Sequence, residues 1–153
     1  MQTLHQTNRH SHHEHASPVT RRMPSPCILV VEDEDLVREA AAQILNEAGY
    51  RVLQAKTAAQ ALGHEAHLLR QVSLLFTDVV LPDQGGRELA MAFLKLRPAI
   101  KVIFTSGYPE KLVIRKSVKG SFYLQKPFSG ENLKGLVARV LRGESLLRSR
   151  RSL

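Results

Sequence analysis

The sequence predicts an α/β fold in which helices cover both faces of a parallel β-sheet. Five short apolar runs alternate with segments whose apolar residues recur at helical spacing, and neither paired hairpins nor an internal repeat interrupt them. Strands that alternate with helices in this way pair in parallel through right-handed crossovers. At 153 residues, 43% of them hydrophobic, the chain is long enough for one domain with a sizeable core.

The first apolar run, residues 27–31, predicts a strand that is buried on both faces. Four acids, residues 32–35, follow it directly. Asp35 suits a helix cap, but capping does not explain acids that directly abut a buried strand. Residues 36–48 then carry apolar side chains at helical spacing, and Gly49 is placed to end this first helix.

A second strand and a second helix follow. Residues 51–55 predict a weaker strand. Thr57 and Gln60 have the spacing of a capping box, which predicts the start of a helix that continues to about Leu69.

The central stretch of the chain is residues 74–82, an apolar run that contains one carboxylate and is broken by Pro82. It predicts a third buried strand with Asp78 at its carboxyl end. Ligands of open α/β sheets bind at that edge of the sheet, which favours a functional role for Asp78. Taken alone, the stretch fits equally well with an aspartate that only caps the next turn.

The remaining elements repeat the strand and helix alternation. A helix is expected from Gly86 to just before Pro98, followed by a fourth strand at 101–105. The apolar face of that helix comprises Leu89, Ala90, Phe93 and Leu96. A short fourth helix is expected from Pro109, a fifth strand at 121–124, and a last helix whose apolar face lies within 133–141.

Polar side chains stand just past four of the five apolar runs. They are Glu32-Asp33 after the first, Asp78 in the third, Thr105-Ser106 after the fourth and Gln125-Lys126 after the fifth. In a sheet of strand order 2-1-3-4-5 these four strands are neighbours about 4.8 Å apart. Acids, a hydroxyl and an ammonium group would then converge at one edge of the sheet.

These motifs, together with Gly86 eight residues after Asp78 and the Lys126-Pro127-Phe128 segment, resemble the receiver domains of two-component response regulators. The resemblance runs from about residue 27 to residue 141, and residues 122–128 particularly resemble receivers that belong to, or work with, hybrid histidine kinases. It implies a flavodoxin-like (βα)5 doubly wound sheet of strand order 2-1-3-4-5. It also implies a cis Lys126–Pro127 bond.

The resemblance further implies a magnesium site. Asp33 and Asp78 would ligate Mg²⁺ directly, with the Val80 backbone carbonyl as a third ligand and Glu32 acting through water. Most family members have aspartate where this chain has Glu32, which affects only the detail of coordination. Elementary chemistry supports the assignment, because three clustered carboxylates need a cation and Mg²⁺ prefers oxygen ligands.

By the same resemblance, Asp78 is the nucleophile that takes a phosphoryl group from a phosphohistidine. Lys126 would neutralise charge on that group, and the Thr105 hydroxyl would bond one of its oxygens. Thr105 and Tyr123 would form the switch that responds to phosphorylation. Ser106 is small enough to leave the phosphoryl group access.

The charge distribution argues against specific nucleic-acid binding. Of the formal net charge of +8, residues 1–24 carry +2 and residues 142–153 carry +3. We therefore expect a disordered His- and Pro-containing tail over 1–24, a receiver domain over 25–143 and a short basic tail over 144–153. The single cysteine and the absence of a long apolar run predict a cytoplasmic protein without a membrane contact.

The expected function is a single-domain response regulator, a phosphoacceptor rather than an enzyme with a separate substrate. Its donor would be a histidine kinase or phosphotransfer protein, and its downstream protein partner would bind the face formed by the fourth helix, fifth strand and fifth helix. A phosphorylation-dependent homodimer stays open, as does a receiver-like interaction module that needs no phosphorylation. A haloacid-dehalogenase-type phosphohydrolase is excluded, because Val80 stands where that chemistry needs a second aspartate.

Overall fold

Five strands form one parallel sheet in the order β2-β1-β3-β4-β5, which confirms the predicted topology. The computed structural model describes residues 23–110 and 118–143. Its strands are β1 (Cys27–Val31), β2 (Arg51–Ala55), β3 (Val72–Asp78), β4 (Lys101–Ser106) and β5 (Phe122–Gln125). All five residues of β1 are buried, as expected for a central strand covered on both sides.

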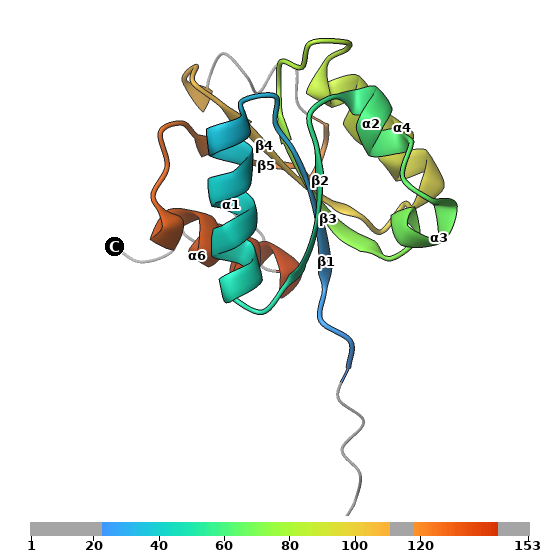
Figure 1. Cartoon of the computed structure of the whole chain (residues 1–153), viewed down its shortest axis with the longest axis horizontal. Coiled ribbons are helices and arrows are strands. Elements are labelled where there is room, and N and C mark those ends of the chain that lie inside the picture. Colours follow the sequence, from blue (N-terminus) through green and yellow to red (C-terminus); the bar gives the residue numbers. More distant parts are fainter. Residues whose placement is uncertain (1–22, 111–117, 144–153) are drawn as a thin grey trace, which may run out of the picture.

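Helices cover both faces of the sheet (Figure 1). They are α1 (Asp35–Glu47), α2 (Ala58–Leu62), α3 (Ala66–Leu69), α4 (Gly86–Leu96) and α6 (Gly130–Leu141). Helices α1 and α6 lie on one face, and α2, α3 and α4 lie on the other. Most of the short helix expected after Pro109 falls outside the described residues. In the described part of the chain, none of the helices has the length and apolar character that crossing a membrane requires.

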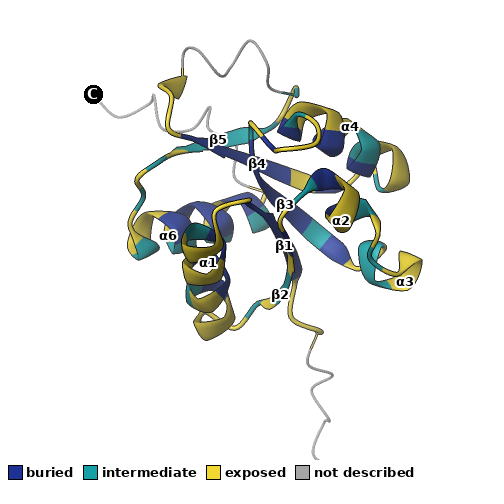
Figure 2. Cartoon of the chain, turned by 45° about the horizontal axis from the view of Figure 1, so that its top comes forward, coloured by how far each residue is buried: buried dark blue, intermediate teal, exposed yellow. Residues whose placement is uncertain are grey.

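Each face of the sheet has its own apolar core, and side chains alternate between the two along the central strand β1. Figure 2 shows the buried residues concentrated in the central strands of the sheet. Ile28 and Val30 of β1 point toward α1 and α6, whereas Leu29 and Val31 point toward α2 and α4. On the α1 and α6 side, the helices contribute Ala41, Leu45, Leu133, Leu136, Val137 and Val140. On the other side they contribute Ala58, Ala61, Leu89, Ala90 and Phe93.

The helix predicted from Thr57 to about Leu69 is wrong as a single element. The capping box forms, because the Gln60 N–H donates to the Thr57 hydroxyl at 3.0 Å. However, α2 ends at Leu62 and the chain turns at Gly63, a residue that costs about 1 kcal/mol in a helix interior. A ring nitrogen of His64 then lies 3.1 Å from the Gln54 carbonyl oxygen, so the break is tied to strand β2.

Three details of the predicted helices also differ from the structure. Leu36 and Leu96, expected on apolar faces, are 83% and 61% exposed. Both lie in the terminal turn of their helix, where burial depends on neighbours beyond the helix's own pattern. The residue at the N-cap of α1 is Glu34, and Asp35 is already in the first turn.

Candidate active site

Three carboxylates meet at the carboxyl edge of the sheet. Glu32 and Asp33 follow β1, and Asp78 is the last residue of β3. One oxygen from each lies within 4.8 Å of the other two. Glu32 is 1% exposed and Asp78 is 9% exposed, whereas Asp33 faces solvent. Because carboxylates this close repel one another strongly, the cluster favours a bound cation.

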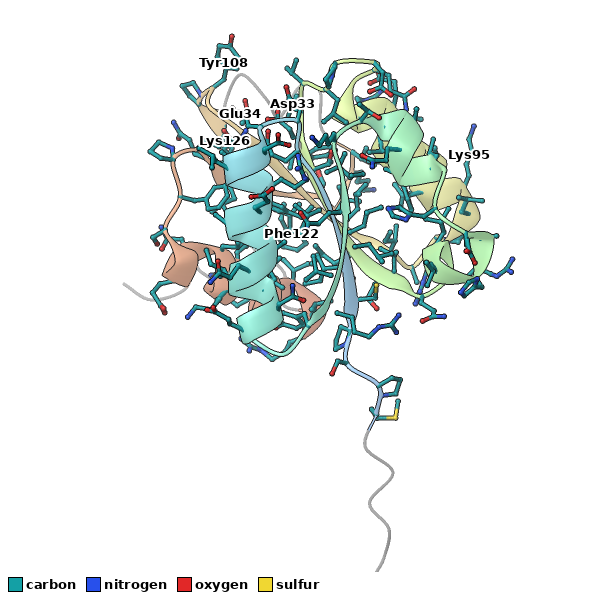
Figure 3. The ribbon with its side chains drawn as sticks, viewed as in Figure 1. Asp33, Glu34, Lys95, Tyr108, Phe122 and Lys126 are labelled. Carbon is teal, nitrogen blue, oxygen red and sulfur yellow. The ribbon has the colours of Figure 1, made fainter. Side chains whose placement is uncertain are left out.

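Lys126 lies between two of these acids. Its Nζ is 2.6 Å from Asp78 Oδ2 and 2.5 Å from Glu32 Oε2. Lys126 follows the last residue of β5, and its side chain extends toward the carboxyl end of β1. Figure 3 shows Lys126 near Asp33 and Glu34 at the carboxyl edge of the sheet. The Lys126–Pro127 peptide is cis, as the resemblance implied. The sheet order therefore brings a cation from the fifth strand to acids from the first and third.

The surroundings raise the pKa of both Glu32 and Lys126, which favours the neutral form of Glu32 and the charged form of Lys126. Burial raises the pKa of Glu32, and the Lys126 ammonium offsets only part of this effect. Burial also opposes the charged form of Lys126, but the bonds to Asp78 and Glu32 outweigh it and raise the pKa of Lys126. Lys126 therefore stays an ammonium group at neutral pH, which is the state required to neutralise an anion.

The backbone around Asp78 fixes its carboxylate. The Val80 N–H donates to Asp78 Oδ1 at 2.9 Å, while Oδ2 accepts from Lys126. The Val79 N–H donates to the Thr105 carbonyl at 3.0 Å, which continues the β3–β4 pairing beyond Asp78. Both carboxylate oxygens are thus engaged by neighbours on different elements.

Thr105 lies beside Asp78 on the neighbouring strand, and Tyr123 contacts the loop that follows Thr105. Thr105 is paired in register with Asp78, and its buried Oγ1 has no hydrogen-bond partner among the described residues. The Tyr123 hydroxyl donates to the Ser106 carbonyl at 3.1 Å and contacts the Tyr108 carbonyl. Burial raises the pKa of Tyr123. The loop after β4 is therefore tied to an aromatic side chain of β5.

The sequence reasoning missed Arg38, a buried guanidinium under the acidic loop. Its Nη1 donates to the Glu32 carbonyl at 3.0 Å, and its Nη2 donates to Asp35 Oδ1 at 2.6 Å. Only 6% of Arg38 is exposed. A signal was present, because Arg38 is three residues before Ala41 on the buried face of α1.

The donor set fits magnesium. The three clustered residues offer only oxygen atoms, and Mg²⁺ is held in proteins by one or two carboxylates with waters in the remaining positions. Thus Glu32, Asp33 and Asp78, predicted to form one site, are brought together. The assignment of the Val80 carbonyl as a ligand stays a prediction, although its loop follows Asp78 directly.

A doubly wound α/β domain with acids and a lysine at the carboxyl edge of its sheet is of the class that binds ligands at that edge. Residues 28–138 match the response regulator receiver domain, and the chain belongs to this family of two-component signalling domains.

Curated relatives support this membership. The chain is 37% identical over 119 residues to the sensor kinase CckA of Brucella abortus (strain 2308), across 76% of this chain and 13% of that protein. It is 36% identical over 126 residues to the DNA-binding transcriptional regulator NtrC of Bradyrhizobium sp. (strain RP501 Parasponia), across 78% of this chain and 25% of that protein. The chain therefore spans only a small part of either relative.

Solved structures of receiver domains support the same family membership. The CheY-like receiver domain protein of Methanospirillum hungatei JF-1 has a TM-score of 0.66 at 28% identity and covers 78% of this chain and 96% of its own. The receiver domain of the hybrid histidine kinase CckA has a TM-score of 0.62 at 33% identity and covers 78% of this chain and 99% of its own. These matches confirm the flavodoxin-like fold and the resemblance to hybrid-kinase receivers.

Proposed function

We propose that this chain accepts a phosphoryl group on Asp78 from a phosphohistidine of a histidine kinase or phosphotransfer protein, and then signals by protein contact. One observation carries the proposal. Asp78 stands at the carboxyl end of β3 with its Oδ2 2.6 Å from the Lys126 ammonium and two further acids beside it. A carboxylate held this way is oriented for attack on an anionic group whose charge Lys126 offsets.

In the transfer step, a carboxylate oxygen of Asp78 attacks phosphorus. The P–O bond forms as the P–N bond of the phosphohistidine breaks, and the imidazole leaves with the bonding electron pair and takes up a proton. The Lys126 ammonium neutralises charge on the phosphoryl oxygens, where most of the catalysis of phosphoryl transfer lies. Slow hydrolysis of the resulting acyl phosphate returns Asp78 to a carboxylate.

Asp33, Asp78 and the Val80 carbonyl are the groups that we assign to hold Mg²⁺, with Glu32 acting through water. When bound, Mg²⁺ supplies positive charge to the transferring phosphoryl group. Asp33, the most exposed of the three acids, offers its carboxylate with the least competition from neighbouring cations. Glu32 is instead engaged by Lys126.

Thr105 and Tyr123 carry the response in this proposal. The buried Thr105 hydroxyl has no hydrogen-bond partner among the described residues, so its hydrogen-bonding capacity is available for a phosphoryl oxygen. Tyr123 would respond through its contacts with the loop after β4. The downstream partner binds the face that includes β5 and α6. A groove of about 660 Å³ on this face is lined by Tyr123, Leu124, Asn132 and Arg139, among others. We place the folded unit at 25–143 and the protein in the cytoplasm.

Phosphorylation with acetyl phosphate and Mg²⁺ tests the proposal. Mass spectrometry should show one acid-stable, base-labile phosphoryl group on the wild type and none on Asp78→Asn. Asp33→Asn should be labelled more slowly and bind Mg²⁺ less well, because it loses a ligand charge. Lys126→Ala should fold yet transmit poorly, and beryllofluoride should shift Thr105 and Tyr123 resonances only when Asp78 is intact.

Labelling of Asp78→Asn at the wild-type rate and stoichiometry would show that the nucleophile is another residue. A wild type that takes no label from any phosphodonor or kinase would instead favour the phosphorylation-independent interaction module.

A further inference from the structure

Strand β2 contributes no side chain to the site, yet the residues at its end and just after it contact both the loop after β1 and the loop after β3. We call residues 55–59 the β2–α2 junction. The Ala55 carbonyl accepts the Glu32 N–H at 3.0 Å, and Lys56 Nζ lies 2.8 Å from Asp35 Oδ1. On its other side, the junction binds the carboxylate of Asp83, which belongs to the loop after Asp78.

The Asp83 carboxylate caps helix α2 from outside that helix. The Ala58 N–H donates to Asp83 Oδ1 at 3.0 Å, and the Ala59 N–H donates to Oδ2 at 2.7 Å. Both are charge-assisted bonds at a helix N-terminus, where backbone N–H groups lack partners within the helix. These bonds, led by that from Ala59, hold the pKa of Asp83 below its usual value.

The loop that contains Asp83 is closed on itself at its base. Val80 pairs with Gly85 in an antiparallel bridge, and the Gly86 N–H donates to the Val79 carbonyl at 2.9 Å. The tip of the loop is tied to α2 by Asp83. The Val80 peptide, whose N–H donates to Asp78 Oδ1 at 2.9 Å, belongs to the base of this loop.

We propose that Asp83 is a positioning residue for the metal and phosphoacceptor site. By binding the N-terminus of α2 it anchors the loop after β3, and so aims the Val80 N–H at Asp78 and the Val80 carbonyl at the cation. The inference rests on the proposed function, because it assigns Val80 to the magnesium site. The start of α2, which follows the edge strand, thereby acts as a fixed support for chemistry that it does not perform.

Thr57 provides a matched control. Its hydroxyl caps the same helix by accepting the Gln60 N–H at 3.0 Å, but among the described residues it forms no hydrogen bond with the loop after β3. Thr57→Ala and Asp83→Ala each remove capping from α2, and both should lower the melting temperature by a similar amount. Only Asp83→Ala should also weaken metal binding.

The test is titration with Mn²⁺ as a spin probe, followed by competition with Mg²⁺. Asp83→Ala should weaken Mn²⁺ binding about tenfold, as loss of outer partners does in other metal sites, and Asp83→Asn, which keeps one acceptor, should weaken it less. Thr57→Ala should bind as the wild type does. Equal affinities for Asp83→Ala and wild type, or an equal loss in Thr57→Ala, would overturn the proposal.

Amide hydrogen exchange without metal separates this inference from the proposed function. The Val80 and Gly86 amides should exchange faster in Asp83→Ala than in the wild type. In Thr57→Ala their exchange rates should equal those of the wild type. Unchanged exchange in Asp83→Ala would overturn the positioning role whatever the metal does. A wild type that binds no Mn²⁺ would refute the magnesium site of the proposed function and, with it, the part of Asp83 in metal binding.

Discussion

The two loops that carry the acids of the site are held in different ways. The β1–α1 loop, residues 32–34, is held mainly by cations: Arg38 binds its backbone from below, and Lys126 pairs with Glu32. The β3–α4 loop, residues 79–85, is held mainly by backbone contacts, including the Val80–Gly85 bridge. One loop therefore depends on charge and the other on close approach of the main chain.

This difference suits the chemistry of the two loops. The β1–α1 loop gathers like charges, so cations must offset their repulsion. The β3–α4 loop places a peptide beside the Asp78 carboxylate, and a peptide is positioned by backbone geometry. Substitutions that remove a cation should therefore destabilise the first loop, and a side chain added at the base of the second should act through steric overlap.

The largest expected effect is that of Gly86→Ala. An added Cβ would overlap the Asp78 carbonyl oxygen and crowd the Val79 Cα, and neither backbone atom can move freely. We expect a loss of about 3 kcal/mol in the free energy of unfolding, measured in urea. Gly85→Ala is the control, because its Cβ would meet only the flexible end of Glu88, and it should cost less than about 0.5 kcal/mol. Equal losses would contradict a loop held by its main chain.

The corresponding change in the charge-held loop is Arg38→Met, which keeps the apolar stem and removes the guanidinium. It removes a buried, charge-assisted bond to the Glu32 carbonyl, so we expect a loss of about 2 kcal/mol. Gln43→Ala on the exposed side of α1 removes only a Gln43–Glu47 pair and should cost less than about 0.5 kcal/mol. If Arg38→Met unfolds at the same urea concentration as Gln43→Ala, the guanidinium is not what holds the loop.

The features that the sequence predicted and those that it did not predict also differ in the kind of contact that determines them. Strand positions were predictable because they depend on apolar runs. The strand order was implied by the resemblance to receiver domains, and in that order the groups that end the runs, Glu32, Asp33, Asp78 and Lys126, converge. Arg38 was missed although its place on the buried face of α1 was a signal, because its partners, the Glu32 carbonyl and the Asp35 carboxylate, cannot be identified from that spacing. Asp83 was missed because its partners are backbone N–H groups of another element and leave no mark in spacing. The break of the predicted helix at Gly63 was missed because a capping box gives the start of a helix and says nothing of its end.

A smaller effect is expected from Val80→Asn, which tests side-chain freedom in the backbone-held loop. Val80 is 62% exposed, so the loop should accept the change. Val80 and Gly107 occupy the positions two after Asp78 and Thr105. Neither has a side chain that can hydrogen-bond a water attacking the acyl phosphate, and we expect a lifetime of minutes or longer. Asn should shorten it a few-fold, a change of less than about 1.4 kcal/mol in barrier height.

Loss of the phosphoryl group is followed by mass spectrometry after the phosphodonor is removed. Gln84→Ala, another exposed position of the same loop, should leave the rate unchanged. An unchanged rate in Val80→Asn would remove the side chain at this position as a determinant of lifetime.

The smallest effect concerns the carboxylate at the tip of the backbone-held loop. The N–H bonds from Ala59 and Ala58 lower the pKa of Asp83 in the folded protein, so folding favours its ionised form. Its contribution to stability is therefore present above the unfolded pKa of about 3.9 and is lost as pH falls through the lower folded value. The difference in stability between wild type and Asp83→Asn should be constant from about pH 7 to pH 5 and shrink below about pH 4.

The same difference in stability should also persist in 1 M NaCl, because the partners of Asp83 are N–H groups. The first partner of Asp35 is instead the exposed Lys56, so the difference in stability between wild type and Asp35→Asn should fall in 1 M NaCl. A salt-sensitive Asp83 difference, in urea unfolding at matched pH, would place both loops under charge control.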